Sequence, residues 1–191
     1  MSGLTCILCY NDHTEDECEE FTLLPKLPGI EKKLCSSTTS NLSKVLLSLP
    51  TQIQLRRCDD SISFYSTVRI FKNTIIGPYD GRFIPEDKIT TPPRNGFLIK
   101  IFRSQGNFVL DARDERKCNW CTLIPPAKTS QEINCLLFQR KYKLYAKVVR
   151  EIKSNESLNI WYSANYAQMI RAKETPDGDK FSKKRNYPCI L

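Results

Sequence analysis

Residues 133–149 read INCLLFQRKYKLYAKVV, and two apolar runs in this stretch, Ile133 to Phe138 and Tyr142 to Val149, flank the polar Gln139-Arg140-Lys141. Both runs contain β-branched and aromatic side chains, which are common in strands. Two such runs joined by a short polar segment are typical of a β-hairpin. The stretch therefore predicts two adjacent antiparallel strands.

Similar runs continue on both sides of this hairpin. Four further segments combine aromatic and β-branched residues, at 62–68, 96–102, 107–111 and 157–162. The segment from Ala164 to Ala172 contains good helix formers and is the main helix candidate. Glycine and proline interrupt the chain often, and strands do not alternate with helices as in parallel α/β proteins. The pattern predicts a mostly β domain with few short helices.

Length and composition fit one folded domain with appendages. The chain has 191 residues, of which 40% are apolar and 26% charged, and it contains no run of the roughly 18 to 20 apolar residues that a membrane helix needs. We therefore expect no membrane association. The net charge of +8 is scattered, with Lys183-Lys184-Arg185 as its main cluster. This charge fits either a solvated surface or a nucleic-acid partner.

Three of the nine cysteines are closely spaced near the N-terminus, at Cys6, Cys9 and Cys18. The count is odd and no signal peptide is visible, so metal binding is favoured over disulfides. His13, the one histidine of the chain, lies in the gap between Cys9 and Cys18. Together these four side chains give the nitrogen and sulfur ligands of a structural zinc site, with Cys35 as a substitute fourth ligand. The alternative is three free cysteines and an exposed histidine.

Four motifs resemble one family when taken in order. Gly77-Pro78-Tyr79-Asp80-Gly81 resembles "GPYEG", and Asn119-Trp120 resembles an "NW" motif that follows an acidic segment, here 111–114. Residues 131–136 resemble "EQNL", and residues 156–167 resemble "ELLVWYGDEYA". The chain thus resembles the PR domain of the PRDM zinc-finger regulators over about residues 45–172. The resemblance implies a SET-type β-clip fold of small curved sheets with few short helices.

The resemblance also implies a division of the chain. Residues 1–21 would form a zinc-knuckle-like module, in which Phe21 stands at the family's histidine position. Residues 22–44 would be an irregular connecting segment and 45–172 the PR/SET domain. The segment 173–191 would be a linker, since residues 186–191 resemble the opening of a C2H2 finger. Cys118 and Cys121 also form a Cys-x2-Cys pair, but they overlap the "NW" motif, so we predict core packing for them.

Active relatives use S-adenosylmethionine to methylate histone lysine. The resemblance assigns the aromatic channel for the lysine amine to Tyr79, Tyr145 and Tyr162, the last matching the family's catalytic tyrosine. Aromatic faces and hydroxyl groups suit a channel that orients an amine. The alternative is that the three side chains pack in a β core.

Two departures from the family pattern affect the cofactor site. Active members carry a glycine-rich turn before "GPYEG", whereas this chain has residues 66–71 there, and no glycine occurs between Ile30 and Ile76. Pro125-Pro126 replaces the Asn-Cys that contacts the cofactor. These changes predict weak or absent methyltransferase activity.

The resemblance implies a nuclear regulator of transcription or chromatin. In this hypothesis the domain is a platform for chromatin and corepressor proteins, downstream zinc fingers bind DNA, zinc is structural and S-adenosylmethionine is doubtful. Two alternatives remain open: an active S-adenosylmethionine-dependent histone lysine methyltransferase, and direct nucleic-acid binding through the basic surface. An exposed strand edge or the N-terminal segment could also support a homodimer.

Overall fold

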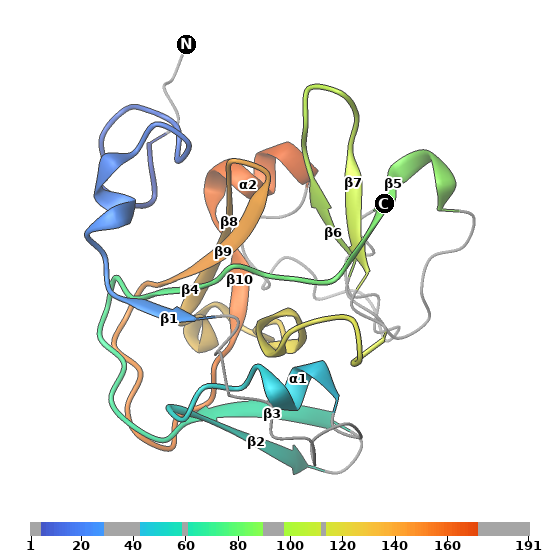
Figure 1. Ribbon diagram of the computed structural model, residues 1–191. Coiled ribbons are helices and arrows are strands. Elements are labelled where there is room, and N and C mark those ends of the chain that lie inside the picture. Colours follow the sequence, from blue (N-terminus) through green and yellow to red (C-terminus); the bar gives the residue numbers. More distant parts are fainter. Residues whose placement is uncertain (1–4, 29–42, 59–60, 90–97, 112–113, 172–191) are drawn as a thin grey trace.

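The computed structural model describes residues 5–28, 43–58, 61–89, 98–111 and 114–171. This part of the chain is mostly β, as expected, and its strands form three small sheets (Figure 1). The strands are β1 Lys26–Pro28, β2 Ile53–Cys58, β3 Ser61–Ser66, β4 Ile75–Gly77, β5 Arg82–Pro85, β6 Leu98–Ile101, β7 Phe108–Asp111, β8 Cys135–Arg140, β9 Lys143–Val148 and β10 Ile160–Tyr162. The helices are α1 Lys44–Leu47, α2 Ala164–Ile170 and the 3-10 turns η1 Glu19–Thr22, η2 Glu86–Lys88, η3 Trp120–Leu123 and η4 Ser130–Glu132. None of these helices is long and apolar enough to span a bilayer.

The largest sheet has the strand order β1-β4-β9-β8-β10. Its centre is the predicted hairpin, because β8 and β9 pair antiparallel from Cys135↔Val148 to Arg140↔Lys143. The turn is one residue shorter than the expected polar segment and consists of Lys141 and Tyr142, with φ values of 43° and 60°. Two left-handed residues in succession give the turn geometry that matches the twist of a two-residue hairpin.

The other two sheets flank this one. The β2–β3 ribbon lies at the end of the molecule near α1, and β5, β7 and β6 form a three-stranded sheet elsewhere (Figure 1). Strands β1, β2, β4 and β5 were not predicted. Strand β1 lies inside the segment 22–44 that was expected to be irregular, and it pairs parallel with β4 through Leu27↔Ile76. A strand of three residues has too few alternating side chains to be recognised from its own sequence.

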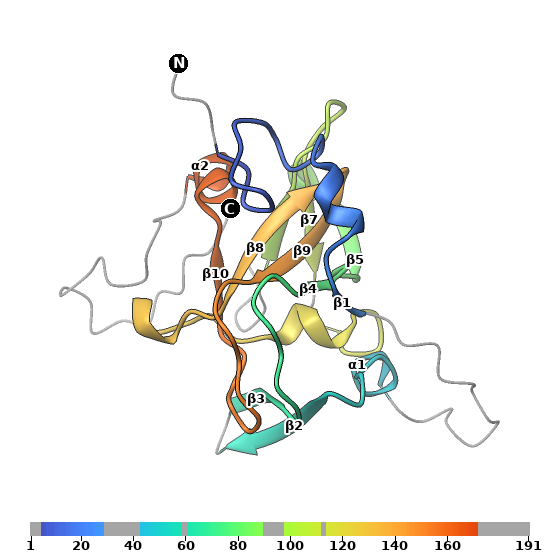
Figure 2. The same ribbon diagram turned by 90° about the vertical axis from the view of Figure 1, so that its left-hand side faces the viewer.

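The two faces of β9 have different partners, because successive side chains in a strand point to opposite faces. Leu144, Ala146 and Val148 belong to the main hydrophobic core. Tyr145 packs with a second cluster that includes residues of the N-terminal module, and Lys147 on the same face hydrogen-bonds to that module. In Figure 2 the module lies directly against the β8–β9 hairpin. The N-terminal module therefore packs on the face of the sheet opposite the main core.

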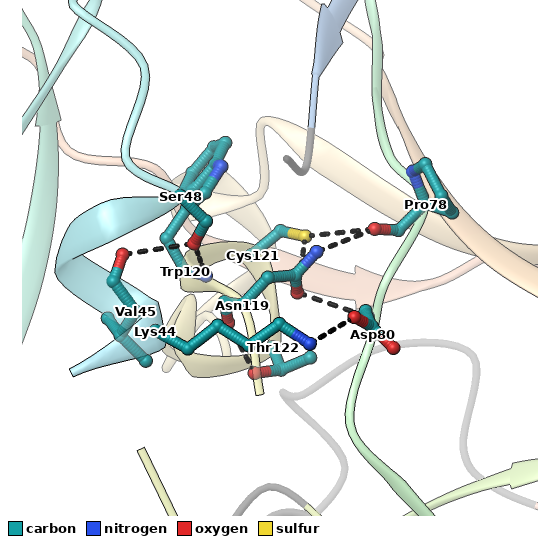
Figure 3. Close-up of polar contacts among 9 residues, drawn as sticks. All are labelled: Lys44, Val45, Ser48, Pro78, Asp80, Asn119, Trp120, Cys121 and Thr122. Carbon is teal, nitrogen blue, oxygen red and sulfur yellow. Dashed lines mark hydrogen bonds and ion pairs between the residues drawn. The ribbon is translucent and has the colours of Figure 1, made fainter. Parts of the chain in front are cut away.

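The "GPYDG" and "NW" segments are joined through the side chain of Asn119 (Figure 3). The amide nitrogen of Asn119 donates to the carbonyl oxygen of Pro78 at 2.7 Å, and its oxygen accepts from the backbone N–H of Asp80 at 3.1 Å. The backbone N–H of Asn119 also donates to the carbonyl of Asp80 at 2.9 Å. Next to it, the N–H of Trp120 donates to the Ser48 hydroxyl at 3.0 Å, which connects η3 to α1. This buried network positions Tyr79, which lies between the two anchored residues.

The first glycine of this segment is required by its surroundings. Gly77 has a φ of +132°, and a Cβ there would lie 3.0 Å from Cδ1 of Tyr145 and 3.2 Å from the Leu144 carbonyl oxygen. The Tyr79 N–H donates to that same carbonyl at 2.8 Å. Glycine thus lets the segment run close to β9 and aligns Tyr79 with the central hairpin.

Replacing Asn119 by alanine should destabilise the domain by roughly 2–4 kcal/mol, because each buried group left without its partner costs about 1–3 kcal/mol. Urea unfolding of zinc-saturated protein measures this change. Asn107→Ala is the matched control, since the partly buried Asn107 amide donates to the Glu86 carboxylate, and we expect a loss below about 1 kcal/mol there. Equal losses in both variants would contradict a special role for the Asn119 amide.

Candidate functional site

The four predicted metal ligands lie together. One ligand atom each from Cys6, Cys9, His13 and Cys18 falls within 4.8 Å of all the others. Zinc–sulfur bonds of about 2.3 Å in a tetrahedron place sulfur atoms roughly 3.8 Å apart. The distances between the ligand atoms would therefore need to shorten by about 1 Å or less for the four residues to bind one zinc ion. Three sulfur atoms and one imidazole nitrogen are a donor set of structural zinc sites. The cluster can hold zinc, and Cys35, the substitute ligand, lies outside the described residues.

A tight turn brings Cys9 back towards Cys6. The N–H of Tyr10 donates to the Cys6 carbonyl at 2.9 Å, the N–H of Cys6 donates to the Asn11 carbonyl at 2.9 Å, and Tyr10 has a φ of 67°. The N–H of Leu8 points at the Cys6 sulfur at 3.4 Å. Backbone N–H groups directed at sulfur favour the thiolate that a metal requires.

His13 is oriented for coordination by its second ring nitrogen. Nδ1 lies 2.9 Å from the Thr14 carbonyl oxygen, which accepts its proton, and Nε2 lies 2.8 Å from the Cys9 sulfur. A backbone carbonyl that holds one imidazole nitrogen fixes the tautomer and leaves the other available for metal.

The three thiols differ in acidity without metal. Burial raises the pKa of Cys6 to about 12 and also raises the pKa of Cys18. Burial acts in the same direction on Cys9, but hydrogen bonds from the Asn11 backbone and His13 lower the pKa of Cys9 to about 7. Metal binding must therefore displace protons from Cys6 and Cys18.

Phe21 has a packing role at the position where the family pattern has histidine. Its ring centroid lies 5.0 Å from that of Tyr145 and 6.5 Å from that of Phe138. The guanidinium carbon of Arg140 lies 4.5 Å from the Phe21 centroid. Phe21 thus anchors the module on the hairpin, and His13 takes the place of the missing ligand in the cluster.

Tyr79 and Tyr162 belong to one aromatic group in the main core. Tyr79 is buried, and Tyr162 packs against the same core cluster. Tyr166 of α2 also belongs to this cluster. Its ring centroid lies 5.8 Å from that of Tyr162, and its hydroxyl donates to the Lys100 carbonyl at 2.7 Å. Burial raises the pKa of all three hydroxyls above their usual value, so they are neutral at physiological pH. Tyr166 was not predicted as a site residue, although it lies in the quoted family motif.

Tyr145 lies elsewhere. Its ring packs against Phe21 and stacks on Phe138 at a centroid distance of 5.9 Å, on the face of the sheet that carries the N-terminal module. The structure therefore brings Tyr79 and Tyr162 to the main core but does not bring Tyr145 to them. The sequence could have indicated this, because strand alternation separates Tyr145 from its core-facing neighbours Leu144 and Ala146.

Tyr79 has one unusual property. Its buried hydroxyl has no hydrogen-bond partner within the described part of the chain. Buried hydroxyl groups are nearly always paired, so an unpaired one marks a position where a water molecule or ligand can bind.

The two segments assigned to the cofactor use their backbone groups internally. In 66–71, the N–H of Ser66 donates to the Glu156 carbonyl, and Ile70 exchanges two hydrogen bonds with Ile152. At the proline pair, the Pro125 carbonyl accepts from the N–H of Ile160 at 3.0 Å. These backbone groups are already satisfied and offer little to a polar ligand.

Cys118 and Cys121 are fully buried in the main core, as predicted. Burial raises the pKa of both thiols, and the Cys121 sulfur contacts the Asn119 side-chain oxygen at 3.1 Å. This pair contributes to packing around η3.

Comparison with known proteins identifies the family. The model of the PR domain of PR domain zinc finger protein 2 matches residues 52–173. PR domain zinc finger protein 15 of Mus musculus is 29% identical over 131 residues, which cover 68% of this chain and 11% of the relative. Histone-lysine N-methyltransferase set-17 of Caenorhabditis elegans is 26% identical over 183 residues, covering 92% of this chain and 65% of the relative. The chain thus spans about a tenth of one relative and just under two thirds of the other.

A solved structure agrees with this result. The methyltransferase domain of human PR domain-containing protein 2 superposes with a TM-score of 0.55 at 24% identity, covering 63% of this chain and 82% of that chain. At this identity the likeness concerns the fold, which is of the SET type. The family model covers more than half of the chain, and the quoted motifs lie within the matched residues. This chain belongs to the PR domain family.

Proposed function

We propose that this PR domain is a regulatory interaction domain with weak or absent methyltransferase activity. The observation that carries the proposal is the internal pairing of backbone groups at Ser66, Ile70 and Pro125. A cofactor with many polar atoms needs free donors and acceptors where it binds, and unsatisfied polar atoms cost about 1–3 kcal/mol each. The residues present at these two places do not fit S-adenosylmethionine.

The same proposal includes a role in transcription or chromatin regulation. The protein acts in the nucleus, where this domain contacts chromatin and corepressor proteins while downstream zinc fingers bind DNA.

Strands β2 and β5 lie at the edges of their sheets within the described residues, and such edges can pair with another chain, including a second copy. Light scattering at micromolar concentration tests the homodimer, and a monomer only would exclude it.

The second candidate is an active histone lysine methyltransferase. Its support is the unpaired, buried Tyr79 hydroxyl in the same core as Tyr162. An arrangement of neutral tyrosines can orient an amine and stabilise a cation by its aromatic faces. The similarity to set-17 keeps this reaction class open for the chain.

S-adenosylmethionine binding separates these candidates. We expect calorimetry to give at least roughly a hundredfold weaker binding than for set-17 measured alongside, because two losses of about 1.4 kcal/mol each correspond to that factor. Transfer of a radiolabelled methyl group to histone tails should stay near background. Micromolar cofactor binding with turnover that disappears in Tyr162→Phe would establish the enzyme instead.

We also propose that the N-terminal cluster holds structural zinc. Metal analysis should find about one zinc per chain, which is lost in the Cys6→Ser and Cys9→Ser variants. The affinity should weaken as pH falls from about 7.5 to about 6, because protons compete for the ligand sulfur atoms. Cys121→Ala is the control and should keep its zinc, since Cys121 lies in the main core. Zinc that persists without Cys6 and Cys9 would contradict the site.

A further inference from the structure

Lys147 is a fully buried lysine on the module-facing side of β9. Its ammonium group donates to the carbonyl oxygens of Ile7 at 2.5 Å and Leu8 at 3.2 Å. It also lies 3.3 Å from the Tyr10 hydroxyl and 4.4 Å from the centroid of the Tyr10 ring. Within the described part of the chain, these contacts of the ammonium group are thus all with the segment that carries the first two cysteines.

The positive charge of Lys147 has no carboxylate partner among the described ion pairs. Glu15, a buried acidic residue of the module, accepts instead from the Ile7 N–H at 3.3 Å and from the Asn165 side chain at 2.8 Å. A buried ammonium group is expensive unless an opposite charge or a complete set of acceptors compensates it. Carbonyl oxygens supply acceptors, but they carry no net charge.

The neighbouring cluster would supply the missing charge. Zinc held by three thiolates and one neutral imidazole carries one net negative charge. Ile7 and Leu8, whose carbonyls hold Lys147, are the two residues between Cys6 and Cys9. The buried cation and the thiolate-rich cluster therefore share one short loop, and Lys147 and two of the four ligands, Cys6 and Cys18, are buried.

We propose that Lys147 is the counter-ion of the zinc–thiolate centre and couples metal occupancy to the central sheet. This inference rests on the proposed zinc site. Two other cross-links between module and hairpin are of other kinds: Arg140 donates to the Cys18 carbonyl at 3.2 Å, and the Lys141 N–H donates to the Asp16 carboxylate at 2.6 Å. Lys147 alone among these residues is both charged and fully buried.

The first test compares Lys147→Met with Lys143→Met, measuring zinc affinity by competition with a chelator. Lys143 lies on the same strand and the same face but is exposed, so it is a matched control. Loss of an outer partner of a metal site typically costs about 10- to 100-fold in metal affinity, and we expect this for Lys147→Met. We expect Lys143→Met to bind zinc like the wild type.

The second test distinguishes charge compensation from simple packing. Lys147→Met is combined with Cys9→Ser, and urea midpoints are compared in a double-mutant cycle. With zinc bound, Lys147→Met should lower the midpoint. Without the thiolate-bound metal, the same change should leave the midpoint unaltered or raise it, because an uncompensated buried cation is removed. An equal decrease in both backgrounds would assign Lys147 to packing alone and overturn the inference.

These measurements distinguish failure of the counter-ion from failure of the zinc site itself. Unchanged zinc affinity in Lys147→Met, with about one zinc per wild-type chain, would overturn the counter-ion and leave the metal site intact. Absence of zinc from the wild type would overturn both. If Lys147→Met does not fold, Lys147→Arg and Lys147→Gln replace it. Zinc retained by the arginine variant and lost by the glutamine variant supports the inference, and equal retention overturns it.

Discussion

The buried amide of Asn119 joins two segments on which the whole arrangement depends. It holds the carbonyl of Pro78 and the N–H of Asp80, and the segment it holds leads from β4 in the five-stranded sheet to β5 in the three-stranded sheet. The neighbouring Trp120 connects η3 to α1 through Ser48. The Asn119 side chain thus holds the connection between two sheets, and the N–H of the next residue ties this point to the helix beside the third sheet. Buried amides with satisfied hydrogen bonds specify a single arrangement better than apolar contacts do, because every alternative leaves polar groups unpaired.

The two faces of the central hairpin contact different parts of the molecule. Alternation along β9 sends Ala146 towards the main core and Tyr145 and Lys147 towards the N-terminal module. A change of register by one residue would exchange these sides. The Cys/His cluster is therefore integrated with the SET-type sheet, since the aromatic contact of Phe21 and the ammonium group of Lys147 both cross the boundary.

On the core side, Tyr79, Tyr162 and Tyr166 belong to or pack against the main hydrophobic cluster. Tyr79 and Tyr166 are buried and Tyr162 is half-buried, whereas Ser66, Ile70 and Pro125 direct their backbone groups to residues of the same chain. The packing of a SET-type domain and the chemistry of methyl transfer thus depend on different residues. The loss of methyl transfer that we propose would therefore leave the packing of the domain intact.

The sequence by itself determined the mostly β class, the hairpin at 133–149, the family and the grouping of Cys6, Cys9, His13 and Cys18. Each of these depends on alternating apolar residues, turn residues or short motif spacings, which are visible in residues close together in the sequence. Only the tertiary structure decided that β1 joins the sheet and that Lys147 meets residues about 140 positions away. Contacts between distant segments arise from closing the chain into a core, and short strands have too few residues to signal their partners.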